Sequence, residues 1–267
     1  MRAAAAGGRR VHLLGRPSIE GQYPGYRMRS RKSWALLAYL LLCERPATRR
    51  ELASLLFEKT DDPLRALRWG LSEVRRALGD DITIADDPVR LQLSPRVVVD
   101  ASVVLAGPSE EAFRVRALGS ELLEGFTLRG AFDFDSWLLG AQRRVAVATA
   151  VVLREAALAA VSQGAYETAI GHAVRLSALS RLDEDSHALL VGLYRLVGDD
   201  LAAQRQYVTS ARILHAELGV APGRALRDAL CQPRLQLPVT KYVHDSRPLM
   251  LMGIAQSHHG ARAVACA

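Results

Sequence analysis

Residues Pro63–Leu78 read PLRALRWGLSEVRRAL, and this stretch decides how the first part of the chain is interpreted. Apolar residues recur at steps of three and four, which places them on one side of a helix: Leu64, Leu67, Leu71, Val74 and Leu78. At about 100° per residue, the opposite side carries Arg65, Trp69, Ser72 and Arg76, flanked by Arg68 and Arg75. Arginines and an outward aromatic residue suit phosphates and base edges, so the stretch predicts a DNA recognition helix.

The segments on either side of this stretch complete a winged helix-turn-helix. A densely apolar helix is predicted over residues 33–43, and Thr48 with Glu51 forms a capping box for a second helix. Asp62 is suited to cap the recognition helix and Pro63 to its first turn. Residues 82–85 and 89–93 alternate around a turn, which predicts a β-hairpin wing.

Short strand-like pieces surround these helices. Residues 11–14, 18–20 and 26–29 are separated by glycines and prolines and predict a small antiparallel sheet. Residues 97–100 are expected to form a strand that closes the domain after the wing. Residues 1–100 are therefore predicted to be a winged helix-turn-helix domain of order β-β-β, three helices, wing.

From residue 101 the pattern is helical almost throughout. Helices are predicted over residues 110–123, 135–163, 166–179, 184–197, 201–218 and 223–230. Gly164 and Gly198 lie 34 residues apart, as do Ala169 and Ala203, and 34 residues is the tetratricopeptide period. Helical hairpins of similar length also recur by chance, so two matched units leave that alternative open.

The predicted fold class is mainly α with a small β component. The domains are 1–100, the winged helix; 101–231, an all-α tetratricopeptide-like region; and 232–267, where prolines interrupt the periodicity and a disordered tail is expected.

The charge is unevenly distributed along the chain. Residues 1–100 contain 18 basic and 12 acidic residues, residues 101–231 contain 13 and 15, and residues 232–267 contain 4 and 1. The excess of positive charge in the first domain is suited to a polyanion, and the slightly acidic middle to a protein partner. Arginine bias without a functional role remains the alternative.

The sequence indicates a cytoplasmic protein with no catalytic site. The three cysteines lack metal or redox spacing, no apolar run of about 18 residues is expected to span a membrane, and no secretion signal is recognised. No phosphate loop, nucleophile elbow or metal-binding His pair is present, and His258–His259 lack a third ligand. Asp133, Asp135 and Ser136 are interpreted as helix caps beside Phe132, Phe134 and Trp137, not as a carboxylate pair.

Together these blocks resemble the SARP/AfsR-type bacterial transcriptional activators, in which an OmpR-like winged helix precedes a bacterial transcriptional activation domain. In the first domain the resemblance rests on Leu13–Pro17, Ser30–Leu40, Thr48–Phe57, Leu67–Gly79 and Val99–Asp100. In the second it rests on Leu122–Phe126, Trp137, Gly164–Ile170, Leu182–His187, Tyr207 and Leu214–Pro222. It implies binding to double-stranded promoter repeats and recruitment of RNA polymerase, without a cofactor.

The chain departs from the family pattern at two positions. Phe57 stands where the family often has tryptophan, and Gly70 lies inside the recognition helix at a cost of about 1 kcal/mol relative to alanine. A protein-binding scaffold with a degenerate winged helix, and a regulator that has lost an ATPase region, remain alternatives.

Candidate DNA contacts follow from these positions. Arg65, Trp69, Ser72 and Arg76 are expected to reach base edges. Contacts to phosphates, or from the wing, are expected from Arg31, Lys32, Arg49, Arg50, Arg68, Arg75 and Arg90. The second domain is expected to offer a surface to RNA polymerase or to a second copy of the chain. The alternative for each charged residue is an ordinary solvated surface.

Overall fold

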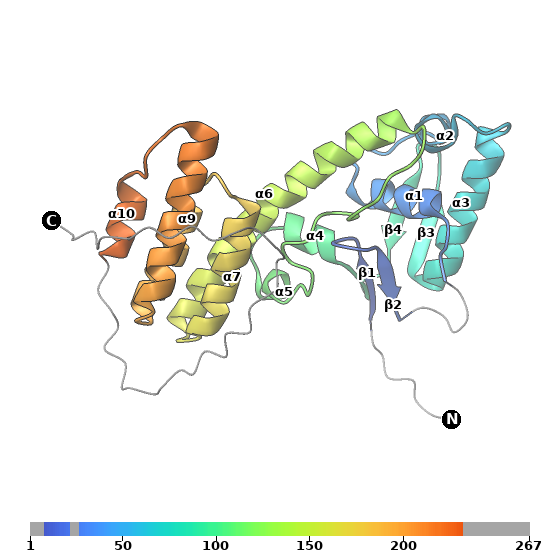
Figure 1. The fold of residues 1–267 in the computed structure, drawn as a ribbon. Coiled ribbons are helices and arrows are strands. Elements are labelled where there is room, and N and C mark those ends of the chain that lie inside the picture. Colours follow the sequence, from blue (N-terminus) through green and yellow to red (C-terminus); the bar gives the residue numbers. More distant parts are fainter. Residues whose placement is uncertain (1–7, 22–26, 232–267) are drawn as a thin grey trace, which may run out of the picture. The chain divides into compact units, whose positions relative to one another are not determined.

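A computed structural model describes residues 8–21 and 27–231 of the chain (Figure 1). The described part is mainly helical with a few short strands, which confirms the predicted fold class. It divides after Ser180 into two compact units, which are described separately below. The predicted boundary at residue 100 stays a prediction, and the predicted tail and His258–His259 lie outside the described residues.

The three predicted helices of the winged helix are present: α1 (Arg31–Leu42), α2 (Arg49–Phe57) and α3 (Pro63–Leu78). The capping box of α2 is confirmed, because Thr48 Oγ1 accepts from the Glu51 N–H and the Glu51 carboxylate accepts from the Thr48 N–H. The second of these bonds favours the ionised carboxylate and lowers the pKa of Glu51. Local side-chain chemistry therefore fixes where α2 begins.

The N-terminal sheet differs from the prediction. Strand β1 (Arg9–His12) pairs antiparallel with β2 (Ser18–Glu20) and parallel with β5 (Val97–Val99), in the order β2-β1-β5. The expected strand that closes the domain after the wing thus joins the first sheet instead. The expected strand at residues 26–29 is wrong for its described part, because the Arg29 N–H donates to the Glu73 carboxylate and not to a neighbouring strand.

The predicted wing is present as the antiparallel hairpin of β3 (Ile82–Ala85) and β4 (Arg90–Leu93). A short 3-10 turn, η1 (Gly79–Asp81), connects α3 to β3. Ile82 and Ile84 are buried while Thr83 is exposed, as expected for a strand with one covered face.

The predicted helix over residues 110–123 is wrong. After α4 (Asp100–Leu105), only α5 (Glu110–Phe113) is helical in this region. Gly119, Leu123 and Gly125 have φ angles of +97°, +52° and +65°, which an α-helix does not accommodate. The segment instead forms turns that bury Leu122 and Leu123, and Leu122 makes a β-bridge with Leu14.

A long helix, α6 (Phe132–Ser162), and α7 (Tyr166–Leu179) complete the first unit. Helix α6 starts three residues before the prediction, and its N-cap residue, Ala131, makes no side-chain cap. The interpretation of Asp133 and Asp135 as caps is therefore wrong; both lie in the first turn, where acidic groups favour the positive end of the helix dipole. Phe134 is fully buried, whereas Phe132 is 75% exposed.

The 34-residue spacing corresponds to structurally equivalent positions. Gly164 follows α6 with a φ of +72°, and Gly198 follows α8 (Glu184–Leu196) with a φ of +82°. A Cβ atom at either position would meet no atom within 4 Å, so glycine is required by the backbone angle and not by space. Ala169 in α7 and Ala203 in the next helix are both fully buried.

The second unit, from Arg181, contains α8, α9 (Asp200–Leu218) and α10 (Arg224–Leu230). Its core consists of small and branched apolar residues: Val191, Ala203, Leu214, Leu226 and Ala229. The Glu184 carboxylate accepts from the N–H groups of Gly223 and Leu226, at 3.0 and 3.2 Å, and so caps α10 from the start of α8.

The expectation about membrane-spanning runs needs a correction. By length and composition, helix α6 is long and apolar enough to cross a membrane. Its apolar window has a mean hydropathy of 1.8, and 39% of that window is buried. A core helix of a soluble protein meets the same test, and α6 also carries Arg143, Arg144, Arg154 and Glu155. The helix is therefore weak evidence for a membrane.

Candidate nucleic-acid interface

Helix α3 begins as its sequence predicts and packs by its apolar side. Asp62 is the N-cap, with its Oδ1 accepting from the Arg65 N–H at 2.8 Å, and Pro63 occupies the first turn. Leu67, Leu71, Val74 and Leu78 are buried as expected. Leu64 was expected on the same stripe but is 42% exposed, so the buried stripe of α3 begins at Leu67.

Gly70 lies where α3 is in close contact with the other two helices. A Cβ atom there would lie 3.3 Å from Leu36 Cδ2 on α1 and 3.4 Å from Phe57 Cζ at the end of α2. The close approach of these side chains therefore explains why glycine is suited to this position in α3. Phe57, which departs from the family pattern, is one of the two groups that Gly70 accommodates.

The opposite side of α3 carries the predicted base-reading residues. Arg65, Arg68, Trp69 and Arg76 are exposed, Trp69 by 56%, and Ser72 is half-buried. We call these five residues the recognition face. Within the described ranges, none of its three arginine side chains makes a hydrogen bond or an ion pair.

Arg75 lies beside the recognition face but is held by the wing. Its Nη2 donates to the carbonyl oxygen of Ile84 on β3 at 2.7 Å, so the guanidinium links α3 to the hairpin. This bond weakens the prediction that Arg75 contacts phosphate. Arg90, at the start of β4, is exposed and keeps its predicted place on the wing.

The cations at the start of α1 are engaged inside the chain. Arg31 donates through Nη2 to the Gly125 carbonyl oxygen at 3.1 Å, and its guanidinium lies 4.9 Å from the centroid of the Phe126 ring. The Lys32 ammonium lies 5.0 Å from the Phe57 ring centroid. Both contacts are cation–π arrangements that hold these side chains in place, and they weaken the prediction of phosphate contacts at this helix end.

The start of α2 is more open. Arg50 is exposed, and its side chain makes no polar contact with any described residue. Arg49 is half-buried, and its main-chain N–H donates to Asp87 in the wing turn at 2.9 Å. Both remain candidates for phosphate contacts.

Glu73 is a structural residue that the sequence analysis missed. It is only 5% exposed and its carboxylate accepts from the N–H groups of Arg29 and Ser30 and from Ser33 Oγ. A carboxylate in the middle of α3 therefore holds the segment that leads into α1. Its side chain is on the packed side of α3 although its residue type suggests the solvent side, and no local signal distinguishes the two.

A second set of polar contacts holds residues 13–15 to the loop before α6. The N–H of Gly15 donates to the Glu121 carbonyl oxygen at 2.8 Å, and the N–H of Leu123 donates to the Leu13 carbonyl oxygen at 2.8 Å. We call the contacts of Leu13–Gly15, Arg31, Asp100 and Glu121–Phe126 the junction. The junction joins the winged helix to the start of the following region within one compact unit.

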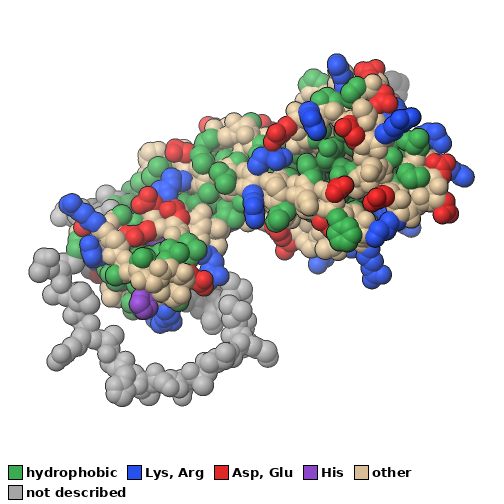
Figure 2. All heavy atoms as spheres, turned by 90° about the horizontal axis from the view of Figure 1, so that it is seen from above, with side chains coloured by type: hydrophobic (Ala, Val, Ile, Leu, Met, Phe, Trp, Pro, Cys, Tyr) green, Lys and Arg blue, Asp and Glu red, His purple; other side chains and the backbone are tan. Residues whose placement is uncertain are grey.

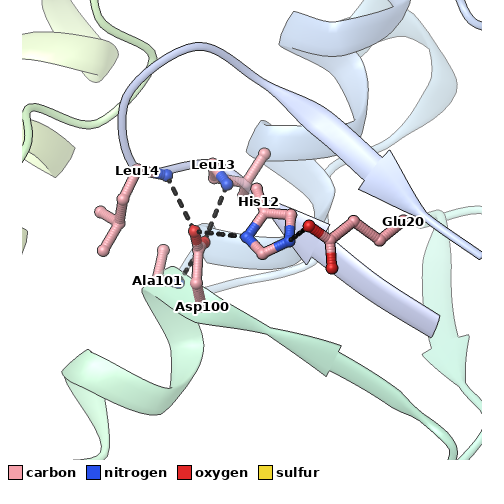
Figure 3. A network of polar contacts seen from close by, with 6 residues as sticks. All are labelled: His12, Leu13, Leu14, Glu20, Asp100 and Ala101. Atoms are coloured by element: carbon pink, nitrogen blue, oxygen red, sulfur yellow. Dashed lines mark hydrogen bonds and ion pairs between the residues drawn. The ribbon is translucent and has the colours of Figure 1, made fainter. Parts of the chain in front are cut away.

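Asp100 is the buried acid of the junction (Figure 3). Its carboxylate accepts from the N–H groups of Leu13, Leu14 and Ala101, and lies 3.5 Å from His12 Nδ1, whose Nε2 is 3.3 Å from Glu20. Burial raises the pKa of Asp100 and outweighs these amide donors and His12, which act in the opposite direction. The arrangement fixes the start of α4 to the residues that follow β1, which is a structural role.

The surface of the winged-helix part is not uniformly positive. On the face seen in Figure 2, lysine and arginine side chains are interspersed with aspartate and glutamate. Among the described residues, no group of three or more histidine, cysteine, aspartate or glutamate side chains could hold a metal ion. The exposed arginines of the recognition face are therefore the best candidates for binding a polyanion.

The comparisons with known proteins give a family match and a similar fold. Residues 102–231 match the family model of the bacterial transcriptional activator domain. Mycobacterium tuberculosis EmbR, solved in complex with a low affinity phosphopeptide, has a similar fold, with a TM-score of 0.54 and 19% sequence identity. The similarity covers 83% of this chain but only 64% of that one. No curated protein sequence matches the chain.

Proposed function

Residues 102–231 belong to the family of bacterial transcriptional activator domains, and from this premise we propose that the chain binds promoter DNA through α3 and activates transcription. The observation that carries the proposal is the recognition face, where Arg65, Arg68 and Arg76 are exposed and without a polar partner in the described part of the chain. Buried apolar packing and Gly70 hold the other side of α3 firmly, so these side chains project from a rigid element.

In this proposal α3 lies in the major groove. Arg65 and Arg76 are eleven positions apart, which corresponds to about 16 Å along the helix axis. At about 3.4 Å per base pair this is the length of roughly five base pairs. Each arginine can donate two hydrogen bonds to a guanine, and Trp69 between them can contact a thymine methyl group or a base edge.

Other exposed cations contribute to affinity rather than sequence preference. Arg68, Arg50 and Arg90 are the strongest candidates for phosphate contacts because their side chains make no polar contact with described residues. Arg31, Lys32, Arg49 and Arg75 remain weaker candidates. The proposal also includes three properties that follow from the family. These are recruitment of RNA polymerase by the activator domain, a cytoplasmic location and the absence of a catalytic role.

A selection of bound sequences from a random duplex library, run with the intact chain at near-physiological salt, tests DNA recognition. An enriched motif of about five base pairs per half-site is expected. Arg68→Ala should then lower the slope of log affinity against log salt by about one phosphate contact without changing the motif. Arg205→Ala, at an exposed position of α9, is the matched control.

A flat selection with only non-specific binding would contradict the proposal. That result would favour the scaffold alternative, in which the helical region binds proteins and the winged helix is degenerate. Steep salt dependence distinguishes the two, because a protein-binding scaffold neutralises no phosphates.

A further inference from the structure

A hollow with a volume of about 430 Å³ lies at the junction, beside the first turn of α1. Three segments that are distant in the sequence line it: Arg16 and Pro17 after β1, Arg31 and Trp34 of α1, and Glu124–Phe126 before α6. All three belong to the first compact unit. Small-molecule sites in proteins typically have volumes of about 300–1,000 Å³, so the hollow has the size of such a site. We call it the junction pocket.

The aromatic walls of the junction pocket are held in place by contacts of their own. The Trp34 Nε1 donates to the Met28 carbonyl oxygen at 3.2 Å, so its polar atom is engaged and the rest of the ring is apolar. Phe126 is half-buried, and its ring centroid lies 6.3 Å from that of the buried Phe134. Two aromatic side chains that are fixed in this way form a preformed wall against which a planar ring can pack.

The charged groups of the junction pocket give it a net charge of +1, from two arginines and one glutamate. Arg16 is exposed, and its side chain makes no polar contact with any described residue. The same holds for the side chain of Glu124, so these two residues do not form an ion pair with each other. Arg31 uses its Nη2 on the Gly125 carbonyl oxygen. The free guanidinium of Arg16 is therefore the group best placed to receive an anion.

The start of α1 adds to this preference for negative charge. The helix begins at Arg31 and has no acidic residue in its first turn, so the positive end of its dipole is not compensated there. A guanidinium such as that of Arg16 can bind a carboxylate through two parallel hydrogen bonds. Glu124 opposes a second negative charge in the same hollow. One carboxylate on an aromatic ring therefore matches both the charges and the walls of the pocket.

We propose that the junction pocket binds a small aromatic monocarboxylate. Its carboxylate pairs with Arg16, its ring packs against Trp34 and Phe126, and Glu124 selects against dianions. A simple inorganic anion is less suited, because it would leave the aromatic walls without a partner. A cationic ligand is less suited as well, because two arginines line the hollow against one glutamate.

The position of the pocket also predicts an effect on stability. Its walls come from α1 and from the loop before α6, which are adjacent only when the first unit is folded. A ligand that binds the folded chain and not the unfolded one raises the temperature of unfolding as its concentration rises. The proposal does not depend on DNA recognition, because none of the residues of the recognition face lines the pocket.

Isothermal titration calorimetry of the intact chain without DNA tests the pocket with three related probes. These are 2-naphthoate, with one carboxylate; 2-naphthol, with none; and naphthalene-2,6-dicarboxylate, with two. We expect one site per chain that binds 2-naphthoate about tenfold more tightly than either of the other two probes. Thermal unfolding followed by circular dichroism should show a midpoint that rises with the concentration of 2-naphthoate.

Two variants assign the binding to the pocket. Arg16→Gln should weaken 2-naphthoate binding about tenfold and leave 2-naphthol binding unchanged, because it removes only the partner of the carboxylate. Glu124→Gln should reduce the discrimination against naphthalene-2,6-dicarboxylate, an effect that a purely structural role of Glu124 would not produce. Arg116→Gln is the matched control, since Arg116 is exposed, makes no polar contact with described residues and lies outside the pocket.

Three results would overturn the proposal. The absence of 2-naphthoate binding at millimolar concentrations would exclude the site. Equal affinities of the original chain and Arg16→Gln for 2-naphthoate would place the binding elsewhere. Displacement of 2-naphthoate by an equal concentration of inorganic phosphate would reduce the pocket to a simple anion site. The circular dichroism measurements without ligand confirm that each variant is folded.

Discussion

The recognition face of α3 and the junction use the same residue type in opposite ways. On the recognition face, Arg65 and Arg76 are exposed and have no polar partner among the described residues. In the junction, Arg31 is also exposed but is bonded to the Gly125 carbonyl oxygen and lies over the Phe126 ring. An arginine near a helix end is therefore a strong candidate for a DNA contact only when the fold leaves its guanidinium free.

This difference separates residues that should determine DNA affinity from residues that should determine folding stability. The arginines of the recognition face can be exchanged without loss of a polar contact in the described part of the chain, so their removal should affect binding and not folding. Residues of the junction hold the winged helix to the loop before α6, so their removal should affect folding first. The predictions below test that separation, beginning with the largest effect.

Replacement of an aromatic residue that packs against the junction, and of one on the recognition face, should give very different stabilities. Phe134 is fully buried, with its ring centroid 6.3 Å from that of Phe126 in the junction. Phe134→Ala should lower the free energy of unfolding by about 3–5 kcal/mol. Trp69→Ala, on the recognition face, should change it by less than about 0.5 kcal/mol. Urea unfolding followed by circular dichroism measures both, and similar losses would remove the distinction.

Replacement of arginines should give the reverse pattern in DNA binding. Arg65→Ala or Arg76→Ala should each relax discrimination at one base position by about 1–3 kcal/mol. Arg31→Ala should leave the sequence preference unchanged, because its guanidinium is already engaged. Binding titrations on the selected motif and its single-base variants measure these effects. An unchanged preference in both α3 variants would exclude the groove assignment.

Glu73 holds α3 to the segment that leads into α1. Its replacement should therefore affect both stability and DNA binding. Glu73→Gln keeps the shape of the side chain but weakens the acceptor for the Arg29 and Ser30 N–H groups, at a cost of about 1–2 kcal/mol in unfolding free energy. DNA affinity should fall as well, since α3 is then held less firmly against α1. Glu111→Gln, at an exposed position, is the control. Loss of stability without loss of affinity would limit Glu73 to folding.

Local signals explain what the sequence could predict. The Thr48–Glu51 capping box and the Asp62 cap each depend on neighbouring residues, and both are found in the structure. The resemblance to SARP/AfsR-type activators is likewise confirmed by the family match over residues 102–231 and by the fold. Such local patterns are not always sufficient, because the cap predicted at Asp133 and Asp135 is absent from α6.

Two of the wrong predictions concern contacts between distant residues. Val97–Val99 pairs with β1 some ninety positions earlier, and no periodicity within either strand indicates that partner. The apolar spacing of residues 110–123 resembles a helix, but the segment is held by residues 13–15 as turns. The same limit applies to the candidate site, because Arg31 and Arg65 differ only in what the folded chain places beside them.

The smallest effect concerns the titration of Asp100 in the junction. Burial raises its pKa above the ordinary 3.8, so the folded state binds this proton more tightly than the unfolded chain does. Its contribution to the free energy of unfolding is therefore present below about pH 3.8 and lost as the pH rises through the folded-state pKa.

Asp100→Asn removes this titration, and the stability advantage of the original protein over the variant should shrink as the pH rises from about 3.5 to 6. Urea unfolding at several pH values measures the difference. If the advantage instead grows with pH, the three amide donors outweigh burial and the junction is held by an ionised carboxylate. Because the recognition face is separate from the junction, Trp69→Ala should leave the pH dependence unchanged, and a change there would show that the two regions are coupled.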